Sequence, residues 1–156
     1  MSDVEVSTVI GASQPEVWDR IASFAGVNHE LGPLLRMTAP AEVEAIEPDQ
    51  VPLGRKWFRS WVLLFGVIPV DYDDLVVVEI DPGAGFLERS SMLTMRVWQH
   101  DRRLNPEGDG TRVTDRLTFT PRALVPKPLA RAVVGFLFRH RHKRLRAWFS
   151  ASDRAP

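Results

Sequence analysis

A histidine and an aspartate occupy matching positions on either side of a predicted turn near the C-terminal third of the sequence. The segment 106–110 (PEGDG) has the composition of a tight turn between two strand-like runs. We take this turn to be centred between Glu107 and Gly108. Antiparallel pairing then places His100 opposite Asp115. An imidazole beside a carboxylate can act as a general acid or base, or can bind an oxygen atom of a ligand.

Alternation along these two strands divides their side chains between two faces. The same register predicts an apolar face made of Trp98, His100, Arg102, Val113, Asp115, Leu117 and Phe119. The other face is much more polar and consists of Gln99, Asp101, Arg103, Arg112, Thr114, Arg116 and Thr118. We therefore expect the first face to point into the protein, with the histidine and the aspartate among apolar groups.

Two interpretations of this pair follow from its chemistry. A hydrogen bond from an imidazole favours the charged form of a buried carboxylate, so the pair could be a core contact that fixes the strand register. Alternatively, Asp115 orients His100 as a general base, or the two groups bind a polar atom of a ligand. The sequence has no cysteine, and no serine is spaced as a nucleophile, so a hydrolytic triad is not predicted.

A long helix is predicted from about Pro128 to Phe149, where no proline interrupts the pattern. At 100° per residue, one arc of this helix contains Leu129, Val133, Phe136, Leu137, His140, Ala147 and Trp148. If this arc packs on the sheet, His140 points toward His100 and Asp115. Two histidines and an aspartate could bind a metal, but their spacing matches no known motif, so neither a metal nor a cofactor is predicted.

Arg144 is expected inside the same arc, whereas the flank and back of the helix are expected to hold Arg131, Arg139, His142, Lys143 and Arg146. Residues 1–80 contain 5 Arg/Lys and 13 Asp/Glu, whereas residues 81–156 contain 15 and 7. The two halves could attract each other within one fold, or the basic helix could bind an anionic surface. Nucleic acid is not predicted as a partner, because no nucleic-acid motif is present and the chain has one tyrosine.

The elements that must position these residues fall into a simple order. Residues 4–10 alternate as a strand, Ser13 is expected to cap a helix, and residues 24–37 form a less regular helix and turn. Six strand-like segments follow, at residues 41–47, 56–65, 70–80, 85–92, 95–105 and 111–120. Strands segregated from helices predict a single α+β domain over residues 1–156, with about seven antiparallel strands and two short helices between strands 1 and 2.

Two segments of the predicted sheet leave alternatives open. Residues 63–70 are all apolar at a hairpin tip, which suggests a cavity entrance, a homodimer contact, a membrane-touching edge or a buried turn. In the strand 85–92, either Glu88 or Arg89 must face inward. The sequence shows neither a secretory signal nor a run of about 18 apolar residues, so we expect a cytoplasmic protein without stable membrane insertion.

The sequence resembles the START-like or SRPBCC superfamily, which includes polyketide cyclases, lipid-transfer domains and birch-pollen-allergen-like proteins. The similarity is carried by residues 12–19 (ASQPEVWD), 64–69 (LFGVIP), 98–100 (WQH) and 110–117 (GTRVTDRL). It implies a helix-grip fold, in which a curved sheet wraps around the C-terminal helix and encloses an apolar cavity. It also implies that residues 28–37 cover the cavity mouth, with Glu30 and Arg36 at its rim.

We therefore expect a protein that binds a hydrophobic small molecule such as a lipid or polyketide, rather than a catalyst. The residues expected at the ligand are Trp98, His100, Asp115, Leu117, Phe119, Val133, Phe136, Leu137, His140, Glu30 and Arg36. One alternative is an enzyme of the polyketide cyclase or dehydratase type that uses His100 with Asp115. A second is interaction with an anionic surface through the basic C-terminal helix.

Overall fold

The structure is a computed structural model that describes residues 1–154. Over these residues it contains seven strands and three helices, which confirms the predicted α+β class and the two short helices after the first strand. The elements are β1 (Ser2–Ile10), α1 (Gln14–Ile21), α2 (Phe24–Leu31), β2 (Leu35–Met37), β3 (Lys56–Leu64), β4 (Ile68–Asp81), β5 (Gly85–Met92), β6 (Met95–Glu107), β7 (Gly110–Pro121) and α3 (Lys127–Arg154).

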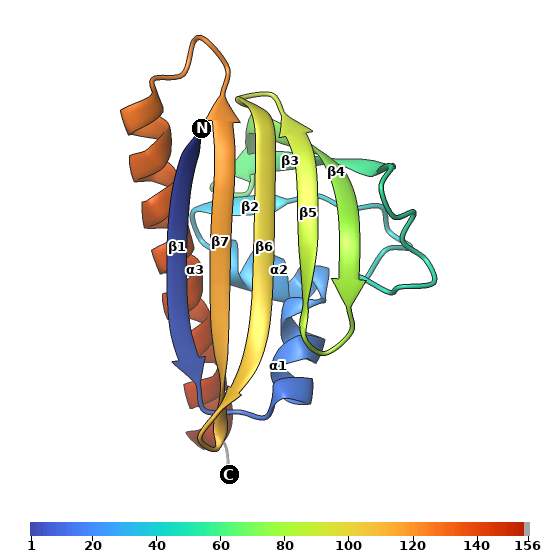
Figure 1. The fold of residues 1–156 in the computed structure, drawn as a ribbon, viewed down its shortest axis with the longest axis vertical. Helices are drawn as coiled ribbons and strands as arrows, with labels where there is room; N and C mark the ends of the chain where they lie inside the picture. Colours follow the sequence, from blue (N-terminus) through green and yellow to red (C-terminus); the bar gives the residue numbers. More distant parts are fainter. Residues whose placement is uncertain (155–156) are drawn as a thin grey trace.

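All seven strands form one antiparallel sheet in the order β1-β7-β6-β5-β4-β3-β2. The sheet is curled, and Figure 1 shows α3 running alongside β1 and β7 over the length of the sheet. The helix packs on β1 and β7 and also contacts α2. The fold is the predicted helix grip, in which one side of the sheet faces a long C-terminal helix.

Hydroxyl caps start both short helices. The side chain of Ser13 accepts a hydrogen bond from the backbone N–H of Glu16, and Ser23 accepts one from Gly26. Such caps satisfy donors that the first helical turn leaves free. The cap predicted at Ser13 is confirmed.

The second strand lies elsewhere than predicted. Residues 41–47 form a loop with a single bridge between Ala45 and Ser23, and the strand is instead Leu35–Met37, paired with β3. The side chain of Asn28 explains this, because its amide oxygen accepts from the N–H of Met37 and its NH₂ group donates to the Met37 carbonyl. The Asn28 side chain on α2 thus holds residues 35–37 in place as an edge strand next to β3.

The predicted register of the β6–β7 hairpin is wrong by two residues. Glu107 pairs with Gly110, so the turn consists of Gly108 and Asp109, and Gly108 has a φ of 57° that suits glycine. His100 consequently pairs with Leu117 rather than with Asp115. Since a shift of two residues keeps every side chain on its face, the predicted apolar face is nevertheless buried as expected.

The predicted orientation of the C-terminal helix is also wrong. Val133 and Phe136 are 53% and 57% exposed, whereas Phe138, Arg141 and His142 are buried. The prediction assumed that charged residues face solvent, but these two polar side chains find partners inside the domain. Over residues 1–154, no helix combines the length and the apolar composition that a membrane span requires.

The space between the sheet and α3 contains two apolar clusters, and a layer of polar side chains lies between them. One apolar cluster includes Val113 and Leu145, and a second includes Leu117 and Phe138. Asp115 lies between Val113 and Leu117, near the midpoint of β7. The polar layer therefore crosses the interior between two apolar halves.

Candidate functional site

Asp115 is the centre of the polar layer and is completely buried. Its Oδ1 atom accepts hydrogen bonds from Nε of Arg102 and Nε2 of His100, both at 2.7 Å. Its Oδ2 atom accepts from Nη2 of Arg102 at 2.7 Å and from Nε2 of His142 at 2.6 Å. A carboxylate has about four acceptor positions, so Asp115 is saturated with donors.

A second carboxylate completes the cluster. Nη1 and Nη2 of Arg102 donate to the two oxygens of Glu30 at 3.1 and 2.9 Å, and Nε of Arg141 donates to Glu30 Oε1 at 3.2 Å. All of these residues are buried. We call Glu30, Arg102, Asp115 and Arg141 the buried charge cluster, in which two positive and two negative groups balance.

The environment keeps both carboxylates of this cluster ionised. Burial by itself would raise the pKa of Asp115, but the charge of Arg102 and the hydrogen bonds from Arg102 and His100 hold that pKa well below its usual value. Burial likewise opposes ionisation of Glu30, and the charges of Arg102 and Arg141 lower its pKa. Because an ionised carboxylate only accepts hydrogen bonds, Nε2 of both histidines must carry the donated proton.

A cavity of about 440 Å³ lies beside this cluster. Its walls come from α2, strands β2 to β6 and α3, which is the space between the curled sheet and the first half of the helix. The apolar lining is Leu31, Leu35, Met37, Val62, Leu64, Val70, Met92, Met95, Trp98, Val125, Leu129, Ala130, Val133, Val134, Leu137 and Phe138. A cavity of this size and make-up is typical of small-molecule sites.

Polar groups gather on the sheet side of the cavity. Asp73, Glu88 and His100 line it from β4, β5 and β6, and all three are buried. Glu88 pairs with His100 across the strands, and its Oε2 atom lies 3.9 Å from Nδ1 of the imidazole. Its Oε1 atom accepts a hydrogen bond from Ser90 Oγ at 3.0 Å. The open alternative in β5 is thus resolved, because Glu88 faces inward and Arg89 is exposed.

Asp73 is the least satisfied polar group of the cavity. It is 2% exposed, and its Oδ1 atom has no hydrogen-bond partner among the described residues. Burial and the neighbouring carboxyl group of Glu88 raise the pKa of Asp73 well above its usual value. We call Asp73 and Glu88 the acid pair.

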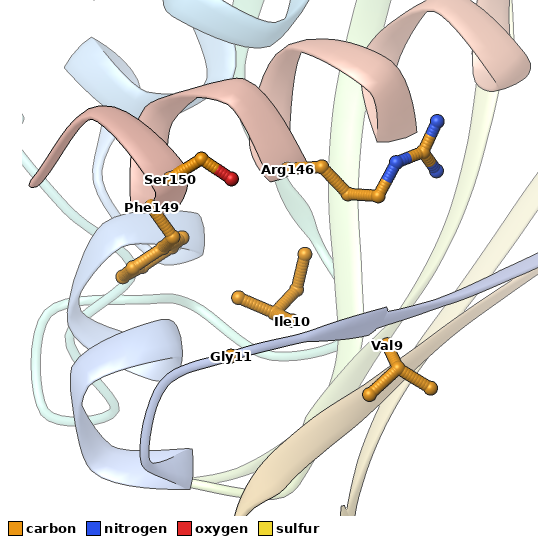
Figure 2. A pocket seen from close by; sticks show the side chains of 6 residues that line it. All are labelled: Val9, Ile10, Gly11, Arg146, Phe149 and Ser150. Atoms are coloured by element: carbon orange, nitrogen blue, oxygen red, sulfur yellow. The ribbon is translucent and has the colours of Figure 1, made fainter. Parts of the chain in front are cut away.

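A second pocket of about 110 Å³ lies between the end of β1 and the last turns of α3. Figure 2 shows Ile10 pointing toward the helix and Phe149 and Ser150 facing it, with Arg146 at one side. The guanidinium of Arg146 donates to Thr8 Oγ1 at 2.8 Å. This pocket has room for little more than a few atoms, so the larger cavity is the better candidate site.

The structure brings only some of the predicted site residues to the cavity. Trp98, His100, Val133 and Leu137 line it. Four other predicted site residues are buried but do not line the cavity, namely Glu30, Asp115, Leu117 and Phe119. Those near or at the surface are Arg36 on β2, Phe136 and His140.

Two of these placements differ from expectation for a clear reason. His140 does not meet His100 and Asp115, because its Nε2 atom bonds to the Gly32 carbonyl at 2.8 Å and the predicted place is taken by His142. Glu30 lies in the interior rather than at a rim, since Arg102 and Arg141 bind its carboxylate.

Sequence reasoning missed several polar residues of the site, namely Asp73, Arg102, Arg141 and His142. The sequence did contain a signal for Asp73, because alternation along β4 places it on the same face as the apolar Leu75 and Val77, which are buried. Arg102 likewise stood on the predicted apolar face. Arg141 and His142 carried no such signal, because their partners lie 111 and 27 residues away in the sequence.

The basic helix end presents fewer surface charges than expected. Arg141 is buried, Arg144 donates to the His29 carbonyl, and Arg146 binds Thr8. Arg139, Lys143 and Arg146 are exposed. Among the described residues, no group of three or more His, Cys, Asp or Glu side chains is arranged to hold a metal ion.

Solved structures of other proteins share this fold. Protein CV1439 from Chromobacterium violaceum has 14% identity and a TM-score of 0.69, covering 94% of this chain and 96% of that one. A START superfamily protein from Mycobacterium smegmatis has 12% identity and a TM-score of 0.67, with coverage of 96% and 97%. DynU16, a putative protein in the dynemicin biosynthetic locus, has 18% identity and a TM-score of 0.62, covering 97% of this chain and 48% of that one.

At these identities the similarity establishes the fold, which is the START-like helix grip. No curated protein matches the sequence significantly. Residues 8–149 match a protein family described as a domain of unknown function, DUF8410, and the chain therefore belongs to that family.

Proposed function

We propose that this protein binds a hydrophobic small molecule in the cavity between its sheet and α3. The observation that carries the proposal is the composition of the lining, in which sixteen apolar residues surround a few polar groups on one wall. Burying an apolar ligand there is favourable by about 25 cal/mol for each Å² removed from water. The polar groups would orient one end of the ligand.

Some apolar side chains of the cavity lining are exposed to solvent, which indicates where a ligand would enter. Leu129 and Val133 belong to the lining and are nonetheless more than half exposed, so they mark its mouth on α3. Across the mouth, Leu64 and Val70 flank the β3–β4 turn, where Phe65 and Val67 are largely exposed. We infer that this apolar turn is the lip of the cavity, one of the roles the sequence left open for it.

The proposal is tested by searching for a ligand and by supplying one. Native mass spectrometry of protein purified without detergent should reveal a co-purifying hydrophobic compound. Pyrene, a neutral hydrocarbon, should bind with one site per chain, and Leu137→Trp should weaken that binding at least tenfold by filling the cavity. Absence of both an adduct and pyrene binding would rule out the proposal.

A second candidate function is proton transfer by His100, and one contact favours it. Asp115 fixes Nε2 of the imidazole, so Nδ1 is left on the side of Glu88 and the cavity. An imidazole held in this way is arranged to accept or deliver a proton at a bound carbonyl compound, as in a cyclase or dehydratase.

Substitution of His100 separates the two functions. His100→Gln should reduce turnover of any substrate at least 100-fold if the imidazole transfers a proton, while pyrene affinity stays within about threefold. Gln99→Ala, on the outer face of the same strand, is the matched control. Unchanged turnover in His100→Gln would leave binding as the function.

A further inference from the structure

The acid pair has no positive partner in the cavity other than His100. Two further charged or titratable side chains line the cavity, Asp71 and Arg141, and each is already engaged. Asp71 accepts hydrogen bonds from Thr94 and from the N–H of Tyr72. Arg141 is paired with Glu30, inside a cluster whose charges already balance. Asp73 and Glu88 are therefore the acidic groups of the lining that are left without a sufficient set of partners.

The oxygen atoms of the acid pair are incompletely bonded. Oδ1 of Asp73 lacks a partner among the described residues although the side chain is 2% exposed. Oε2 of Glu88 is 3.9 Å from the nearest imidazole nitrogen, which is beyond hydrogen-bonding distance. Both side chains line the cavity. A buried polar atom left unpaired is unfavourable, so a ligand that donates hydrogen bonds to these oxygens is favoured.

We propose that Asp73 and Glu88 bind the protonated amino group of a hydrophobic amine. This inference rests on the proposed binding function and names the ligand class. An ammonium group donates up to three hydrogen bonds and brings the positive charge that the two carboxyl groups lack. The hydrocarbon part of the amine would lie against the apolar lining, where Trp98 and Phe138 stand near His100.

The same arrangement should reject fatty acids. A ligand carboxylate beside the acid pair would bring a further acidic group into a poorly hydrated cavity, where the like charges would repel each other. Arg141 offers little compensation, because Glu30 already neutralises it. An alcohol of the same length should fall between the amine and the acid.

Amine binding should also release a proton. The acid pair holds a proton up to a higher pH than an ordinary carboxyl group does, because burial and Glu88 raise the pKa of Asp73. When the ammonium group binds, that proton is no longer needed to offset the second carboxylate and passes to solvent. The other groups that could take part are Asp71 on β4, Glu88 on β5, His100 on β6 and Arg141 on α3.

Displacement of pyrene by ligands of equal chain length tests the inference. At pH 7, 1-octylamine should displace pyrene at a concentration at least tenfold lower than 1-octanol, and octanoate should be at least tenfold weaker than 1-octanol. Isothermal titration in two buffers of different ionisation enthalpy should detect proton release with the amine and none with the alcohol.

Variants show whether the preference comes from the acid pair. In Asp73→Asn/Glu88→Gln the amine and the alcohol should differ by less than about threefold, each measured against pyrene bound to the same variant. Asp74→Asn, on the outer face beside Asp73, should keep the full preference. The inference fails if wild-type protein binds pyrene but binds the alcohol or the acid at least as tightly as the amine. Failure of pyrene to bind, together with the absence of a co-purifying compound, would instead reject the underlying binding function.

Discussion

Arg102 binds both carboxylate oxygens of Asp115 at 2.7 Å, directly across the β6–β7 ladder. Neither side chain has any exposed surface. A buried pair of this kind contributes little by forming, because both ions lose their hydration, but it is costly to break. Asp115 also accepts hydrogen bonds from His100 and His142. The positions of Arg102 and of both imidazoles therefore depend on this one carboxylate.

Asp115→Asn should lower the free energy of unfolding by about 3–5 kcal/mol at pH 7, because it leaves two buried arginines with a single carboxylate. Urea denaturation followed by tryptophan fluorescence measures this change. Glu5→Gln, which breaks the exposed ion pair with Arg116 on the neighbouring strand, should change it by less than about 1 kcal/mol. Equal effects of the two substitutions would contradict the assigned role of Asp115.

Stability should depend on pH in two opposite ways. Asp115 and Glu30 have lowered pKa values in the folded protein, so their contribution is present above the unfolded values of about 3.9 and 4.3 and is lost as pH falls toward the folded values. Asp73 has a raised pKa, so the folded state loses stability as pH rises through that value.

Asp73→Asn isolates the second effect. The variant should be more stable than the wild type at pH 8, by about 1–3 kcal/mol, because a buried carboxyl group whose raised pKa opposes folding at this pH is removed. At pH 4 the advantage should shrink or vanish, since Asp73 is then protonated. Chemical denaturation at the two pH values provides the comparison, and a constant difference between them would be inconsistent with the raised pKa.

The orientation of α3 can be tested with two phenylalanines on opposite sides of the helix. Phe138→Ala should cost about 3–5 kcal/mol, because its ring is 2% exposed and packs near Trp98 and His100. Phe136→Ala, at a ring that is 57% exposed, should cost less than about 0.5 kcal/mol. The orientation expected from helix angles alone predicts the reverse ranking, so thermal or urea unfolding decides between them.

The fold was predictable because its signals are local. Alternation in the strands, the Ser13 cap and the proline-free C-terminal helix each depend on a few neighbouring residues. The residues on the inward face of β6 and β7 were also predictable, because side chains alternate between the two faces of a strand. The predicted register was wrong by two residues at the glycine-rich turn, and a shift of two leaves every side chain on the same face. A helix-angle argument failed for α3, because it could not know that Arg141 and His142 meet Glu30 and Asp115 inside the domain.

The site was predictable only in part for a related reason. His100 and Asp115 were found because two neighbouring strands carry them. Asp73 and Glu88 lie on the neighbouring strands β4 and β5 but are not cross-strand partners, because Asp73 pairs with Met92 and Glu88 pairs with Val77. Their meeting depends on how the two strands pair and curl, which has no local signature in the sequence.

Blocking the cavity mouth should prevent ligand entry without disturbing the fold. Val133→Trp adds bulk at an exposed lining position, so pyrene affinity should fall at least tenfold with little change in unfolding free energy. Val67→Trp, at a position that is 74% exposed and outside the lining, is the matched control and should bind normally. Fluorescence titration provides both affinities, and equal affinities would show that the mouth lies elsewhere.

The position of bound pyrene is the most direct test of the proposed binding site between the sheet and α3. Isotope-filtered NMR of the ¹³C-labelled protein with unlabelled pyrene detects protons of the two molecules that lie within about 5 Å of each other. We predict contacts from pyrene to the Trp98 ring and to the methyl groups of Val134 and Leu137, all within the cavity lining. Contacts confined to exposed side chains such as Phe65 and Val67, or none at all, would contradict an internal binding site.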